Sequence, residues 1–226
     1  SFRMIKYSNI KSVLKFSLPL SFGVLFLWMQ TQSYGIIIEK YIGAEFLGYF
    51  GVGMALAFAI SSAFETIVMQ YLYPVMYKKM KDENKFKNTI NDILNLIIPI
   101  YFLLAIFVSL FAIYMITLLV DMKYYDSYIY TIFGIWIAFF RMSSNMIANI
   151  AHAKLNTKKL IFPYAVAGIL SAVGVVFATQ VNFYQYLIPS VLLFASFIGF
   201  LYMFFEMNKL VNIKLNLGTF YSIVFY

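Results

Sequence analysis

One polar stripe in an otherwise apolar run carries the residue types that could do chemistry. The run extends over residues 127–153, and a single charge, Arg141, falls near its middle. At 100° per residue, five polar side chains of the run lie within about 140° of arc on one helical face. They are Arg141, Ser144, Asn145, Asn149 and His152. A charge at mid-bilayer costs from about 3 to more than 10 kcal/mol, so Arg141 needs a partner or a hydrated cavity.

Glu65 is the carboxylate that this geometry offers to Arg141. It lies at a similar depth, within about 5 Å along the membrane normal, on a predicted helix that runs in the same direction. Two interpretations stay open. The two residues form a buried ion pair that holds their helices together, or they line an aqueous cavity. In the cavity, Arg141 would bind an anionic substrate, because a guanidinium binds phosphate with two parallel hydrogen bonds. Glu65 would bind a proton or a cation.

The other candidate residues are amides and an aromatic ring. We expect Asn145, Gln30, Gln32 and Trp28 to join Arg141 in a substrate-binding cavity, since sugars are held by amides and aromatic rings. Side-chain amides inside membranes also join helices to one another, and this second interpretation applies to Asn145, Asn149 and the two glutamines. His152 is expected at the membrane surface.

The composition sets the class of protein. Of 226 residues, 63% are hydrophobic and 12% are charged, whereas a soluble domain carries about 25% charged residues. The chain has no cysteine, one histidine and nine carboxylates, so we expect no metal site, no cofactor and no enzymatic activity. Nucleotide-binding, serine-hydrolase and zinc-protease motifs are absent from the sequence.

The hydrophobic segments predict an all-α integral membrane protein with a bundle of six transmembrane helices. Four helices are expected within residues 16–38, 46–77, 93–120 and 127–153. Residues 160–205 contain no charge and would make one helix of about 69 Å, more than twice the thickness of the hydrocarbon layer. That stretch must therefore be a helical hairpin, with its turn at residues 180–185.

Three regions follow from this pattern. Residues 1–15 form a basic linker, cytoplasmic or interfacial, and residues 16–206 form the six-helix lobe. Residues 207–226 form a cytoplasmic turn and the possible start of a seventh helix from Leu215. We expect the chain to be part of a longer, two-lobe transporter.

The positive charges predict the orientation. Of the 17 Lys and Arg residues, 14 fall before the first helix, between the second and third, between the fourth and fifth, and after the sixth. The remaining loops carry only Lys40 and Lys123. By the positive-inside rule, the N-terminus of the chain is cytoplasmic.

Two motifs resemble a known family. They are Phe16-Ser-Leu-Pro19-Leu and the run from Tyr41 to Phe50, YIGAEFLGYF, and a later Asn156-Thr-Lys158-Lys159 precedes the apolar hairpin. The pattern resembles Wzx-type flippases of polysaccharide and O-antigen biosynthesis, in the multidrug/oligosaccharidyl-lipid/polysaccharide exporter superfamily. The resemblance covers nearly the whole chain as the C-terminal half of such a protein.

The resemblance implies a function and partners. The chain would help to flip undecaprenyl-pyrophosphate-linked oligosaccharide across the bacterial cytoplasmic membrane by alternating access, with proton or sodium coupling. Its partners would be that lipid-linked substrate, the phospholipid membrane and the N-terminal half of the transporter, and no nucleic acid. The alternative within the superfamily is an ion-coupled multidrug or cation exporter. A third class, a membrane-embedded polysaccharide polymerase or acyltransferase, is disfavoured by the short external loops.

Overall fold

The computed structural model describes residues 7–216 and Gly218, and all regular elements among them are helices. The elements are α1 (Tyr7–Tyr41), α2 (Ala44–Lys78), α3 (Glu83–Leu119), the 3-10 helix η1 (Met122–Ser127), α4 (Tyr128–Ala153), α5 (Lys158–Ala178) and α6 (Tyr184–Asn208). In the described part of the chain, α2, α3, η1 with α4, α5 and α6 are long and apolar enough to cross a membrane. The protein is thus an all-α, multi-pass membrane protein, and the crossing by the 35-residue α1 stays a prediction.

The predicted hairpin is confirmed, whereas several helix bounds differ from the prediction. The turn between α5 and α6 begins at Thr179, and α6 begins at Tyr184, close to the predicted residues 180–185. The first helix begins at Tyr7, inside the segment predicted as a basic linker. Residues 1–6 of that linker and most of the predicted seventh helix lie outside the described residues.

The third helix also begins earlier than predicted. The Asp82 side chain accepts a hydrogen bond from the Lys85 backbone N–H and caps α3, and this bond lowers the pKa of the exposed Asp82 carboxyl. Phe86 and Ile90 are buried and extend the apolar face of α3 toward this cap. The charged residues around them, Glu83, Lys85, Lys87 and Asp92, hid this first part of the helix from the hydropathy pattern.

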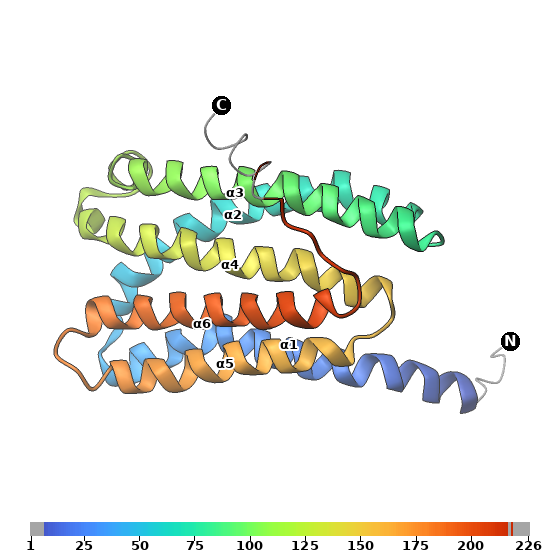
Figure 1. Ribbon diagram of the computed structural model, residues 1–226. Coiled ribbons are helices and arrows are strands. Elements are labelled where there is room, and N and C mark those ends of the chain that lie inside the picture. Colours follow the sequence, from blue (N-terminus) through green and yellow to red (C-terminus); the bar gives the residue numbers. More distant parts are fainter. Residues whose placement is uncertain (1–6, 217, 219–226) are drawn as a thin grey trace, which may run out of the picture.

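α4 is the central helix of the bundle (Figure 1). It packs against α2 and α3 on one side and α6 on the other, and α6 in turn packs on α5, which runs along α1. α1 and α2 meet near the loop that joins them, where the rings of Tyr34 and Phe50 lie 5.6 Å apart. From there the two helices diverge (Figure 1).

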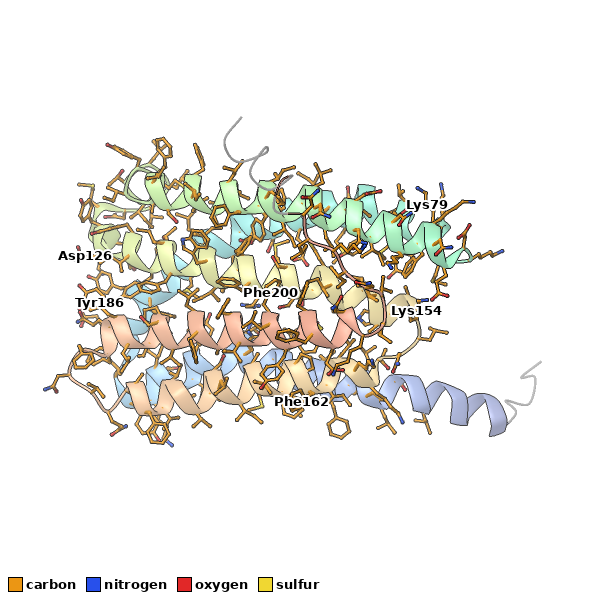
Figure 2. The ribbon with its side chains drawn as sticks, viewed as in Figure 1. Lys79, Asp126, Lys154, Phe162, Tyr186 and Phe200 are labelled. Atoms are coloured by element: carbon orange, nitrogen blue, oxygen red, sulfur yellow. The ribbon has the colours of Figure 1, made fainter. Side chains whose placement is uncertain are left out.

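The two ends of the bundle differ in charge. Lys79 and Lys154 lie at one end, which is also the end where α1 begins, and Asp126 and Tyr186 lie at the other (Figure 2). At the lysine-rich end, a segment after α6 returns to α3 and is held by side-chain amides. The Asn91 Oδ1 accepts from the Lys214 N–H at 3.0 Å, and the Asn95 Nδ2 donates to the Lys214 carbonyl at 2.8 Å.

Glycines allow α2 and α4 to approach each other closely. A methyl group at Gly134 of α4 would lie 2.8 Å from the Ala57 Cβ of α2. One at Gly53 of α2 would meet the Ser127 carbonyl oxygen and lie 2.7 Å from the Tyr130 Cβ. Small residues are what membrane helices use where backbones come together, because apolar side chains gain little by leaving lipid for protein.

Gly53 offers a matched test of this packing. Gly53→Ala should destabilise the protein by about 1–3 kcal/mol, because backbone atoms of η1 and α4 occupy the space that the methyl group needs. Gly51→Ala, two residues away on the same helix, is the control, because nothing lies within 4 Å of its new methyl group. Thermal denaturation of the purified protein in detergent measures both; equal melting temperatures would contradict the close approach of α2 to α4.

Candidate functional site

A pocket of about 240 Å³ lies between α2 and α4. Its lining residues come from those two helices: Phe58, Ser61, Ser62, Glu65, Ala138, Arg141, Met142 and Asn145. We call this the Arg141 pocket. Its volume falls just below the range of about 300–1,000 Å³ that is typical of small-molecule sites, so it suits part of a ligand, such as a headgroup, better than a whole oligosaccharide.

Arg141 has no ionic partner in the described part of the chain. No carboxylate oxygen there lies within ion-pairing distance of its guanidinium, and its buried Nε makes no hydrogen bond. Its guanidinium makes a cation–π contact with Phe58, whose ring centre lies 5.0 Å from the guanidinium carbon. A cation over an aromatic face is worth about 0.5–2 kcal/mol, much less than the cost of taking the charge out of water. The guanidinium can therefore still bind an anion.

Glu65 lines the same pocket without touching Arg141. Among the described residues its carboxylate makes no ion pair and no hydrogen bond, and its charge interacts with that of Arg141 across the pocket. The matching depth inferred from the sequence thus brings the two residues to one pocket. The structure shows them as separate charges on its wall, not as the ion pair of the first interpretation.

Asn145 and Asn149 join α4 to its neighbours. The Asn145 Oδ1 accepts a hydrogen bond of 3.1 Å from the Tyr164 hydroxyl of α5. The Asn149 Nδ2 donates to the Tyr73 hydroxyl of α2 at 2.7 Å, and its Oδ1 accepts from the Tyr77 hydroxyl at 3.4 Å. Asn149 has the contacts of a residue that connects helices. Asn145 has such a contact and also lines the Arg141 pocket.

Gln30 of α1 lies near Arg141 at a second pocket, distinct from the one between α2 and α4. Gln30 is 6% exposed, and its Nε2 donates to the Ser196 hydroxyl of α6 at 3.2 Å. Gln30, Arg141, Asn145 and Tyr164 also line a second, enclosed pocket of about 10 Å³, which is the volume of about one water molecule. Arg141 therefore lies between this inner pocket and the larger Arg141 pocket.

The remaining sequence candidates lie elsewhere. Trp28 is 48% exposed, and Gln32 is also exposed; neither lines one of the two pockets around Arg141. His152 is half-buried near the end of α4. A role for Trp28 or Gln32 in substrate binding would thus require a surface on α1 outside these pockets.

Sequence reasoning missed the tyrosines around the site. The Tyr101 hydroxyl of α3 donates to the Ser61 Oγ at 2.8 Å, and Ser61 donates to the Ala57 carbonyl at 2.9 Å. Tyr101 is fully buried, and its ring lies 5.0 Å from that of Phe64. A tyrosine in the middle of a membrane segment is a usable signal, because its hydroxyl needs a polar partner there.

The comparison with known families gives the identity of the chain at the family level. A family model described as polysaccharide biosynthesis protein matches residues 2–129. The chain belongs to this family. No curated protein and no solved structure matches it. In this polysaccharide biosynthesis protein, the matched segment contains Gln30 and Glu65. It ends at the second residue of α4, so Arg141 lies beyond it.

No group of three or more potential metal ligands occurs among the residues that the structure describes. The candidate site of the polysaccharide biosynthesis protein is therefore described by its charges, amides and hydroxyls. Its two charged side chains face one pocket from two adjacent helices, at the centre of a membrane-spanning bundle.

The connection between α2 and α4 at Asn149 is testable by a double-mutant cycle. Asn149→Leu and Tyr73→Phe should each destabilise the protein, and the pair should show a coupling free energy of about 0.6–1.7 kcal/mol, as for hydrogen bonds between membrane helices. Thermal denaturation in detergent gives the four free energies. Strictly additive effects would show that the 2.7 Å hydrogen bond contributes nothing to stability.

Proposed function

We propose that this chain is one six-helix lobe of a transporter that flips lipid-linked oligosaccharide across the bacterial cytoplasmic membrane. The substrate we propose is an undecaprenyl-pyrophosphate-linked repeat unit for a surface polysaccharide such as O-antigen. The second lobe is the N-terminal half of the same transporter, and substrate crosses by alternating access. The chain carries out transport and no bond-making chemistry.

The observation that carries this proposal is the unpaired Arg141 in a pocket inside the membrane-spanning bundle. A lipid-linked oligosaccharide presents its pyrophosphate at the boundary between a polar headgroup and an apolar tail. An arginine binds phosphate oxygens through parallel hydrogen bonds, and the low dielectric of the bundle strengthens that attraction. Membership of a polysaccharide biosynthesis family supplies the substrate class that such a pocket would serve.

The second candidate function is ion-coupled export of drugs or other cations. The observation that favours it is Glu65, whose carboxylate lines the same pocket and has no partner there among the described residues. The two functions differ in which residue binds the substrate. A flippase needs the charge of Arg141 for its substrate, and a cation exporter needs that of Glu65.

Replacing Arg141 distinguishes the two functions. In the full-length protein, Arg141→Ala should reduce surface polysaccharide at least tenfold, a loss equivalent to about 1.4 kcal/mol of substrate binding or more, and Arg141→Glu should abolish it. Lys123→Ala is the control cation, because it lies outside the pocket. The measurement is cell-surface polysaccharide at matched amounts of membrane protein. Normal polymer from Arg141→Glu would remove Arg141 from the mechanism.

The six-span topology is tested by labelling. Because the chain has no cysteine, single cysteines at Lys78 and at Lys123 can be reacted separately with an impermeant thiol reagent. Lys78 should react only from the cytoplasm and Lys123 only from outside, since the positive-inside rule places the lysine-rich end in the cytoplasm. Reaction of both from the same side would contradict the orientation and the number of spans.

A further inference from the structure

Two side chains of opposite charge line the Arg141 pocket without forming an ion pair with each other. Arg141 and Glu65 both line it, and no ion pair joins them. In a low-dielectric site, charges of opposite sign attract strongly, so side chains that remain apart must each be stabilised by something else. A ligand that enters the pocket would contact both side chains and could stabilise both charges together.

Arg141 contacts α2 at a residue other than Glu65. The guanidinium lies over the Phe58 ring at 5.0 Å, and Phe58 belongs to the same helix as Glu65, about two turns earlier. Arg141 therefore has a resting place on α2 that is separate from the carboxylate. The wall also contains hydroxyls, since Ser61 and Ser62 come from the stretch of α2 between Phe58 and Glu65.

We propose that the Arg141 pocket recognises a zwitterionic headgroup: a phosphate on Arg141 and a protonated amine on Glu65, as in a phosphorylated amino sugar. This proposal rests on the proposed function and narrows its substrate to repeat units whose phosphate-linked sugar carries a free amine. A ligand with both charges stabilises both side chains at once. A purely anionic ligand would leave Glu65 unpaired and repelling the phosphate, and a simple cation would leave Arg141 unpaired.

The volume of the pocket agrees with this ligand. About 240 Å³ accommodates a single sugar phosphate, which is one headgroup unit of a lipid-linked substrate. In such a sugar the amine and the phosphate are held on adjacent carbon atoms, so the two charges are close and yet separate. The pocket likewise presents its two opposite charges on separate side chains, from neighbouring helices.

The test compares two nearly isosteric ligands. Glucosamine 1-phosphate and glucose 1-phosphate differ only in an amine or a hydroxyl beside the phosphate-bearing carbon. Their binding to the purified full-length protein is measured by isothermal titration calorimetry, at a pH where the amine is protonated. The wild-type protein should bind the amine-bearing ligand about tenfold more tightly, a difference that corresponds to about 1.4 kcal/mol.

The variants separate this proposal from the proposed function. Glu65→Gln, which keeps the shape of the side chain, should remove the preference for the amine and leave glucose 1-phosphate bound as well or better. Arg141→Gln should weaken the binding of both ligands. Equal binding of the two ligands to the wild-type protein would overturn the zwitterion proposal and leave the anion site in place. Failure of both ligands to bind would overturn the zwitterion proposal, whereas the proposed function is overturned separately, by normal surface polysaccharide from Arg141→Glu.

A further result would assign Glu65 differently. If the wild-type protein shows no preference for the amine, and if sodium or a change of pH alters glucose 1-phosphate binding only when Glu65 is present, Glu65 is a coupling residue. That outcome overturns the zwitterion proposal. An amine preference that persists in Glu65→Gln would overturn it too, because the carboxylate would then not be its origin.

Discussion

Keeping a guanidinium charged inside a membrane is the constraint on which the site depends. Arg141 belongs to the central helix α4, in a bundle whose segments are long and apolar enough to cross a bilayer. Transfer of this charge into hydrocarbon costs several kcal/mol, and the Phe58 ring offsets only a small part of that. The surrounding helices therefore have to provide a polar pocket, and their packing can be understood as the means of doing so.

The packing of α4 meets this requirement in two ways. Toward α2, small residues such as Gly134 and Ala57 bring the backbones together, while the larger space beyond them becomes the Arg141 pocket. Toward α5, Asn145 accepts a hydrogen bond from the Tyr164 hydroxyl, and beside α4 the Gln30 amide of α1 donates to the Ser196 hydroxyl of α6. These polar groups pair with one another and hold the helices. Arg141 and Glu65, which line the pocket, have no ion-pair or hydrogen-bond partner among the described residues.

This contrast separates residues that hold the bundle from residues that are free to bind. Asn149 was one of several equivalent polar residues on the stripe, and its hydrogen bonds to Tyr73 and Tyr77 account for its presence. Hydrogen bonds of this kind do not explain Arg141 and Glu65. Burying each charge costs free energy, and no ion pair with a described residue compensates for that cost. In a polysaccharide biosynthesis protein, a site that combines both charges fits a substrate that carries both as well.

The sequence by itself determined the class of protein and the helical hairpin at residues 160–205, and it predicted a similar depth for Arg141 and Glu65. Hydropathy and helical rise are local properties, and they depend on composition and spacing alone. Only the tertiary structure decided which way the side chains face. Gln30 and Gln32 are two residues apart, yet one is buried against α6 and the other is exposed. Tyr101, Tyr73 and Tyr164 became partners of the site only because α3, α2 and α5 surround α4, and contacts between distant segments leave no periodic signal in the sequence.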